Sequence, residues 1–268
     1  MHTFSVYLRL IHGLVRSQMQ YRVSFVMDLI ATTFYTVVEF ASLVLILTRI
    51  RTLGSWSIPE ITLLYGLAEL SFALMDLVFA GFDPAIFGAF IRQGSLDQLM
   101  LRPVSLTAQV MGSDFGLRRL GKCLMGLGIL LYGVWASGID WTPEKALFLV
   151  LVLVGMVLFF AGLFMIGSTI TFWTVDSVEA MNLLTYGGRA MIQYPMSIYQ
   201  DWLRRIFTFV VPAIFLNYYP VLYLLNKPDP FGMPTWIHWL SPVVGSGTFL
   251  LAVLFWRYGI RHYQSTGT

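Results

Sequence analysis

The chain has 268 residues, of which 57% are hydrophobic and only 12% are charged, and its formal net charge is +3. A soluble domain carries about 25% charged residues, so this composition excludes an ordinary water-soluble protein and makes lipid the solvent for much of the surface. The net positive charge is small and the sequence contains no long run of basic residues, so we expect no nucleic-acid partner. A single cysteine, Cys123, excludes an internal disulfide and a cysteine metal cluster.

Residues 3–22 have the pattern of an amphipathic helix that lies in the membrane interface. Apolar residues recur at spacings of three and four, whereas Arg9, Arg16 and Gln20 lie off this stripe, near the headgroups. The sequence leaves open whether this helix only anchors the chain or also contacts a partner. The apolar residues of the stripe are Phe4, Leu8, Ile11, Val15 and Met19.

Long apolar stretches predict an all-α membrane protein with six transmembrane helices, since one span needs about 20 mostly apolar residues. The stretch at 177–225 is interrupted by glycine, proline and charged residues, and we interpret it as one span followed by a re-entrant hairpin over 200–225. Backbone of that kind is tolerated at bilayer depth only where protein or a water-filled cavity covers it. The predicted spans cover roughly 25–48, 60–81, 121–138, 146–173, 178–197 and 239–257.

The distribution of lysine and arginine predicts the orientation of these spans. With six spans and the N-terminus inside, the cytoplasmic segments hold more Lys and Arg than the outer segments, so both termini should be cytoplasmic. Treating 202–225 as a seventh span would instead place Arg257 and Arg261 outside. We therefore expect a multi-pass protein with one transmembrane domain over residues 1–268.

A short helix is predicted in the loop between the second and third spans. Ser95 and Gln98, three residues apart, form a capping-box pattern, and Asp97 adds a negative charge to the first turn. Pro103 disfavours helix at Arg102, so the helix should end near the preceding residue. The result is a helix of barely two turns.

This helix lies within 83–120, the longest predicted cytoplasmic segment and the one place with room for contacts outside the lipid. Leu96, Leu99 and Met100 would share one of its faces, because residues three and four apart are neighbours on a helix. A helix this short is unstable alone. Its apolar face should therefore dock on a partner, or else lie on the membrane surface or against a span.

The same loop resembles the first cytoplasmic loop of type-2 ABC exporter permeases, in which an Arg-x-Gly-x-Leu-Asp-x-Leu-Leu-x-x-Pro run precedes the third span. Here the run extends from Arg92 to Pro103. Three other segments resemble a drug-exporter-like branch of that family, and together they cover essentially the whole chain. They are Tyr21-Arg22, Gly54-Ser55-Trp56-Ser57 and Tyr194-Pro195-Met196-Ser197-Ile198-Tyr199.

The resemblance implies six spans, an interfacial helix, a coupling helix and re-entrant helices before the last span, in a prokaryotic plasma (inner) membrane. The sequence has no Gly-x-x-x-x-Gly-Lys-Ser/Thr loop to bind nucleotide. We therefore expect that this chain is not an enzyme. ATP and magnesium would belong to a separate ATPase subunit, and a second copy or a related permease would complete the pathway. Arg189, inside the fifth predicted span, departs from the family pattern. The residues expected to contact the ATPase are Ser95, Leu96, Asp97, Leu99, Met100 and Arg102.

Three carboxylates lie within predicted spans, Glu39 in the first and Glu69 and Asp76 in the second. A charge at bilayer depth costs at least about 2.5–3.5 kcal/mol, so such groups usually face a cavity or a partner. One interpretation is an acidic pathway that favours cationic, apolar substrates, with Phe40 and Phe72 binding flat cationic rings. The other is that protonated or hydrogen-bonded carboxyl groups join the helices.

The sequence therefore predicts a permease subunit of an ATP-driven exporter of amphiphilic small molecules, cationic ones included. The alternatives are a proton-coupled secondary transporter, which the missing internal repeat disfavours, and an intramembrane enzyme. Ser246 lies between two glycines, as a serine nucleophile would, but no histidine lies inside a predicted span to activate it. We interpret that serine as a small packing residue.

Overall fold

The computed structural model describes residues 2–50, 55–174 and 179–264, and its elements are helices. Five helical stretches are long and apolar enough to cross a membrane, and a bent pair of helices would make a sixth span if counted as one. The predicted all-α membrane fold is thus confirmed. The long helices are α1 (His2–Gln20), α2 (Arg22–Ile50), α3 (Ile58–Phe79), α7 (Arg118–Ala136), α8 (Pro143–Thr174) and α13 (Leu240–His262).

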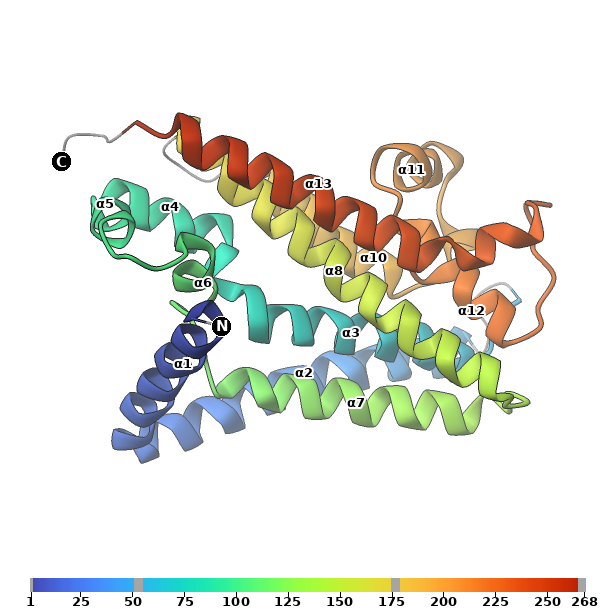
Figure 1. Cartoon of the computed structure of the whole chain (residues 1–268). Coiled ribbons are helices and arrows are strands. Elements are labelled where there is room, and N and C mark those ends of the chain that lie inside the picture. Colours follow the sequence, from blue (N-terminus) through green and yellow to red (C-terminus); the bar gives the residue numbers. More distant parts are fainter. Residues whose placement is uncertain (1, 51–54, 175–178, 265–268) are drawn as a thin grey trace.

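The bundle has two ends, which we name after the short helices found there (Figure 1). At the α5 end lie α1 and the end of α13, and the connection from α3 to α7 adds three short helices. These are α4 (Pro84–Arg92), α5 (Ser95–Met100) and α6 (Leu106–Met111), which together we call the α4–α6 lobe. At the α12 end lie α12 (Tyr218–Leu224) and the start of α13. Helix α1 runs steeply across the direction of the spans, as expected of an interfacial helix.

The described part of the predicted fifth span is less regular than expected. It consists of α9 (Glu179–Asn182), a π-helical turn η2 (Leu183–Gly187) and α10 (Gly188–Ile192). The glycine pair and Arg189 make this segment a poor regular helix, and its described residues are not part of the five long spans.

The segment predicted as a re-entrant hairpin contains two helical stretches, Asp201–Phe209 and Ala213–Leu224, which meet at 80°, a geometry that fits a broken span as well as a re-entrant loop. Pro212 lies at the bend and removes a backbone donor, so a continuous helix cannot form there. The buried Asn217 side chain donates to the carbonyl oxygens of Leu64 (2.9 Å) and Ile192 (2.7 Å). These bonds attach the hairpin to α3 and α10, which covers non-helical backbone with protein.

Close packing of α7 on α3 depends on glycine. A Cβ atom on Gly66, Gly126 or Gly133 would lie 2.6 to 2.9 Å from the backbone of the facing helix, closer than carbon atoms can approach. Without a hydrophobic force between helices in lipid, contact of this kind is what holds membrane helices together. Helix α3 is consequently buried in the middle of the bundle, whereas α2 packs loosely and exposes most of its side chains.

Replacing Gly133 by alanine should push α7 off α3 and lower stability by about 1–3 kcal/mol, the usual cost of overpacking. Gly128 is the matched control, because it lies on the same helix with nothing within 4 Å of an added Cβ. Alanine there should be neutral or stabilising, since it favours helix over glycine. Thermal unfolding of the purified permease in detergent measures both variants, and equal melting temperatures would contradict the packing account.

Candidate functional site

An ion-paired cluster joins three helices in the interior of the bundle. The Arg189 guanidinium, on α10, donates to the Glu69 carboxylate on α3 and lies 3.9 Å from the Glu39 carboxylate on α2. Gln193 donates to the same Glu69 oxygen at 3.3 Å. We call these four residues the Arg189 cluster. The Glu69 side chain is 4% exposed, whereas that of Glu39 is 35% exposed.

The aromatic residues expected to bind a substrate ring already have partners inside the chain. The Arg189 guanidinium lies over the Phe72 ring, 5.1 Å from its centroid, and Phe40 packs on Tyr65 at 5.5 Å. Arg189 thus occupies the position between acid and ring that a cationic substrate was expected to take. The Arg189 Nε and the Tyr65 hydroxyl are buried without a hydrogen-bond partner in the described part of the chain, so the cluster is not fully satisfied.

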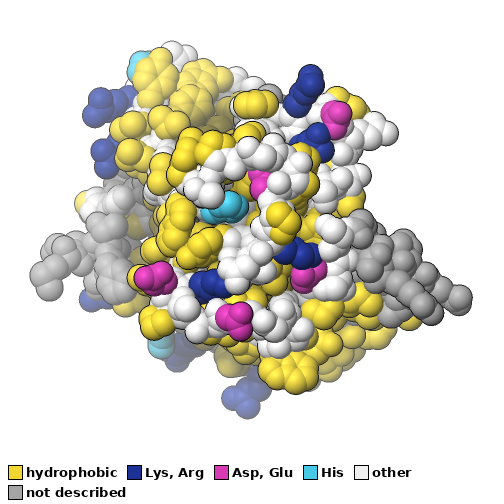
Figure 2. Space-filling model, turned by 90° about the vertical axis from the view of Figure 1, so that its right-hand side faces the viewer, with side chains coloured by type: hydrophobic (Ala, Val, Ile, Leu, Met, Phe, Trp, Pro, Cys, Tyr) yellow, Lys and Arg dark blue, Asp and Glu magenta, His cyan; other side chains and the backbone are white. Residues whose placement is uncertain are grey.

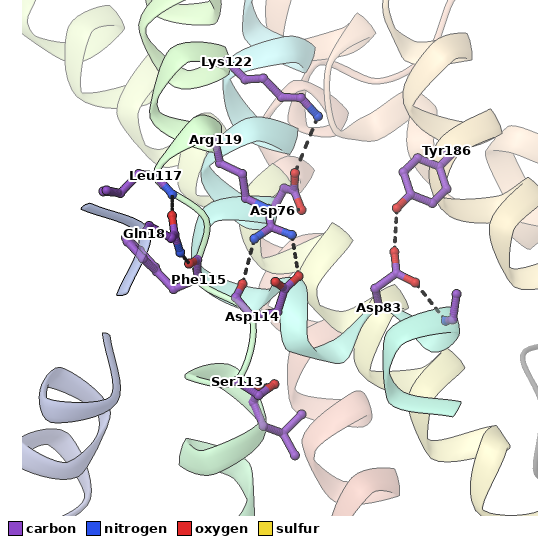
Figure 3. Close-up of polar contacts among 12 residues, drawn as sticks. Gln18, Asp76, Asp83, Ser113, Asp114, Phe115, Leu117, Arg119, Lys122 and Tyr186 are labelled. Carbon is purple, nitrogen blue, oxygen red and sulfur yellow. Dashed lines mark hydrogen bonds and ion pairs between the residues drawn. The ribbon is translucent and has the colours of Figure 1, made fainter. Parts of the chain in front are cut away.

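Asp76 belongs to a separate network near the α5 end. Its carboxylate accepts from Arg119 Nε at 3.1 Å and lies 3.8 Å from the ammonium of Lys122, both on α7. Arg119 also donates to the carboxylate of Asp114 at 2.6 Å (Figure 3). Two acids face two bases here, which balances the charge of Asp76 and locks the start of α7 to α3.

A third polar contact joins the α4–α6 lobe to the short fifth segment. Asp83 caps α4, because one of its carboxylate oxygens accepts from the backbone nitrogen of Ala85 at 2.9 Å. The other oxygen accepts from the hydroxyl of Tyr186, on the η2 turn, at 2.6 Å (Figure 3). The Tyr186 ring also packs on Phe72 and Phe164, at 5.5 and 5.9 Å.

The start of α5 differs from the prediction. The capping box at Ser95 is wrong: the helix is capped by Gly94 in a left-handed conformation (φ 65°), and Ser95 is its first residue. Glycine adopts positive φ without steric cost, so the chain turns there, one residue before the expected position. The predicted end of the helix is confirmed, since Leu101 is its C-terminal cap.

The predicted apolar face of α5 divides into a buried and an exposed part. Leu96 is fully buried within the chain, Leu99 and Asp97 are partly buried, and Met100 is 42% exposed. The neighbouring Leu101 is 86% exposed. Leu96 therefore packs in the core of this chain, and the surface available to a partner at this end is formed by Gln98, Met100, Leu101 and Arg102.

The α4–α6 lobe also contacts the last span, α13. Trp256 of α13 donates from its indole nitrogen to the hydroxyl of Thr107 on α6 at 3.0 Å. Tyr263, directly after α13, lies beside Asp97 of α5, and burial, followed by the Asp97 carboxylate, raises the pKa of its phenol above the ordinary value. These contacts attach α5 and α6 to the end of α13.

A family model described as "ABC-2 family transporter protein" matches residues 33–267. The chain belongs to this family. It is the membrane component of an ABC-2 type transporter, and such a component carries no catalytic domain and works with ATPase partners. Comparison with curated proteins and comparison with solved structures each gave no match. The resemblance drawn from the loop sequence is confirmed over most of the chain.

The α12 end of this ABC-2 permease carries aromatic and paired charged side chains. Lys227 binds Glu60 at 2.6 Å and lies over the Trp56 ring, 4.7 Å from its centroid. Figure 2 shows this end, with charged side chains interspersed among hydrophobic ones. Next to Lys227, a groove of about 480 Å³ is lined by Trp236, Trp239 and other residues between α12 and α13. Tryptophan at this level is typical of a membrane interface.

Sequence reasoning located the acids but not the cations that pair with them. Two features of the sequence could have indicated these cations. Arg189 is a charged residue in an apolar stretch, and Arg119 and Lys122 lie at the start of a predicted span. The Ser246 hydroxyl donates to the carbonyl of Pro242 in its own helix at 2.6 Å, as a packing residue would. Tyr186 and Asp83 had no distinguishing pattern in the sequence.

Replacing Arg189 by glutamine should destabilise the ABC-2 permease by about 3–5 kcal/mol, because Glu69 is then buried without a cation. The double variant R189Q/E69Q removes both charges and keeps two hydrogen-bonding amides of similar shape. It should recover most of the loss, and thermal unfolding of the two single variants and the double variant measures the coupling. If the losses simply add in the double variant, the two side chains do not form a pair.

Proposed function

We propose that this chain is the permease subunit of an ATP-driven exporter that moves amphiphilic small molecules, with its α5 end in the cytoplasm. The observation that carries the proposal is the exposed surface of α5 on a lobe that follows α3 along the chain and is bonded to α13 and to the fifth segment. An ATPase bound there would act on three parts of the bundle at once. The excess of Lys and Arg in the segments of this end agrees with a cytoplasmic location.

The proposed ATPase contact is an apolar and basic surface. Leu101 and Met100 supply exposed apolar area, and Arg102 supplies a positive charge. Beside them, Leu99, Arg102 and Arg9 line a groove of about 350 Å³ between α1 and the lobe. An ATPase segment bound in this groove would give the interfacial helix a partner contact in addition to its anchoring role. Ser95, Leu96 and Asp97 would support the surface from behind, since they face the chain itself.

A second permease, either another copy or a related chain, would lie against α2. This helix packs loosely on the rest of the chain, and it carries Glu39 with a third of its side chain exposed. A carboxylate facing lipid at the middle of a span costs at least about 2.5–3.5 kcal/mol. A second permease, or a water-filled pathway between the two, removes that cost.

The charge of the cargo depends on Glu39. Glu69 is neutralised by Arg189, and Asp76 is balanced by Arg119 and Lys122, so these two acids contribute little net field to a pathway. Glu39 is the remaining negative charge of the Arg189 cluster, and it is the more exposed of its two acids. A preference for cationic amphiphiles, if the pathway passes this cluster, would come from that carboxylate.

Replacing Leu101 by aspartate should weaken binding of the ATPase, since the exposed leucine would be replaced by a charge that the contact must desolvate. The loss should be at least tenfold in affinity, about 1.4 kcal/mol or more. Gln264→Asp is the control, because it adds the same charge at the same end but outside α5. Surface plasmon resonance with the purified ATPase measures both variants. Wild-type affinity in Leu101→Asp would rule out α5 as the docking surface.

Replacing Glu39 by glutamine should reduce export of a dicationic dye several-fold and leave export of a neutral analogue unchanged. The amide keeps the size of the side chain but removes the field that lowers the cost of a cation. Glu144→Gln is the control, because this exposed acid lies at the start of α8, outside the cluster. Equal transport of both dyes by Glu39→Gln vesicles would mean that the carboxyl has only a structural role.

A further inference from the structure

The α4–α6 lobe and the Arg189 cluster are connected by one short path of contacts. The path begins at Asp83, the N-terminal cap of α4, and α4 leads through Gly94 into α5. It crosses to the fifth segment at the hydrogen bond from Tyr186 to Asp83. Three residues further along the chain, Arg189 binds Glu69. This path therefore runs from the exposed α5 surface to the ion pair within the bundle.

Phe72 connects the two steps of the path in space. The Tyr186 ring lies 5.5 Å from the Phe72 ring, and the Arg189 guanidinium lies 5.1 Å from the same ring. The two side chains thus share one aromatic surface on α3. A shift of Tyr186 cannot occur without repacking against the residue that holds the Arg189 guanidinium in place.

The backbone at this point is suited to move. Tyr186 lies in the π-helical turn η2, followed by the glycine pair Gly187-Gly188. A π-turn widens the helix and weakens its hydrogen bonding, and such turns often occur at functional sites. The hydroxyl of Thr185 bonds back to the carbonyl of Met181 at 2.9 Å, which adds to the local irregularity.

The geometry points to Tyr186 as a positioning residue for transport, whose hydrogen bond to Asp83 transmits the movement of the α4–α6 lobe to Arg189. Pulling α4 pulls the carboxylate that caps it, and the phenol that donates to this carboxylate moves the π-turn. Arg189 then shifts relative to Glu39, and the charge that faces the pathway changes with the state of the ATPase. This inference rests on the proposed function, since it assumes an ATPase bound at α5.

Hydrogen–deuterium exchange of the assembled permease–ATPase complex tests the transmission without knowledge of the cargo. Exchange is compared between the nucleotide-free complex and the complex trapped with ATP and vanadate, in peptides covering 84–102 and in peptides covering 179–198. In the wild type, nucleotide should change exchange in both. In Tyr186→Phe, which removes one hydroxyl and keeps the ring, the 84–102 response should remain and the 179–198 response should fall by more than half.

Two further variants distinguish a specific bond from general damage. Tyr132→Phe, an exposed tyrosine on α7, should behave as the wild type. Asp83→Asn keeps a side chain that caps a helix but offers the phenol a neutral acceptor, so its 179–198 response should lie between those of the wild type and Tyr186→Phe.

The outcomes distinguish failure of the role of Tyr186 from failure of ATPase docking at α5. A wild-type response at 179–198 in Tyr186→Phe overturns the role of Tyr186, while the ATPase proposal stands. The same role is overturned if the 84–102 response is lost together with the 179–198 response in this variant, because the lobe itself has then been damaged. No nucleotide response at 84–102 in the wild-type complex overturns docking at α5, and the inference fails with it.

Discussion

The cost of charge inside a bilayer is the constraint on which the bundle depends. Arg189 and Glu69 would each be expensive alone at this depth, and their pairing joins α10 to α3. The described part of the segment that carries Arg189 is irregular, because it contains the π-helical turn η2. This ion pair and the hydrogen bonds of Asn217 attach it to α3 and to the segment that follows it.

The hydrophobic pattern of the sequence predicted most of the fold, because apolar runs of sufficient length cross a membrane whatever their neighbours are. Pro212 and the flanking charges likewise indicated the break between the two helices of the bent pair. The partners of Glu69 and Asp76 could not be predicted, because pairing across more than forty residues depends on how helices pack rather than on local spacing. The cap of α5 was misplaced for a local reason, since Gly94 and Ser95 are both acceptable caps and only the turn geometry decides between them.

The α4–α6 lobe contacts much of the bundle despite its small size. It bonds to the last span through Thr107 and Trp256, and it bonds to the fifth segment through Asp83 and Tyr186. At the same end, Gln18 of α1 bonds to the backbone of Phe115 and Leu117, at the start of α7 (Figure 3). Under the proposed function, an ATPase bound to this lobe would contact a part of the chain that is bonded to several helices.

Site-specific cross-linking in intact cells tests the central claim, that an ATPase drives this ABC-2 permease from the α5 end. A photoreactive amino acid at position 101 should link to an ABC ATPase, identified by mass spectrometry of the joined peptides. The same amino acid at position 236, exposed at the α12 end, should give no such product. Links to an ATPase from position 236, or none from position 101 in a complex that contains the ATPase, would contradict the account.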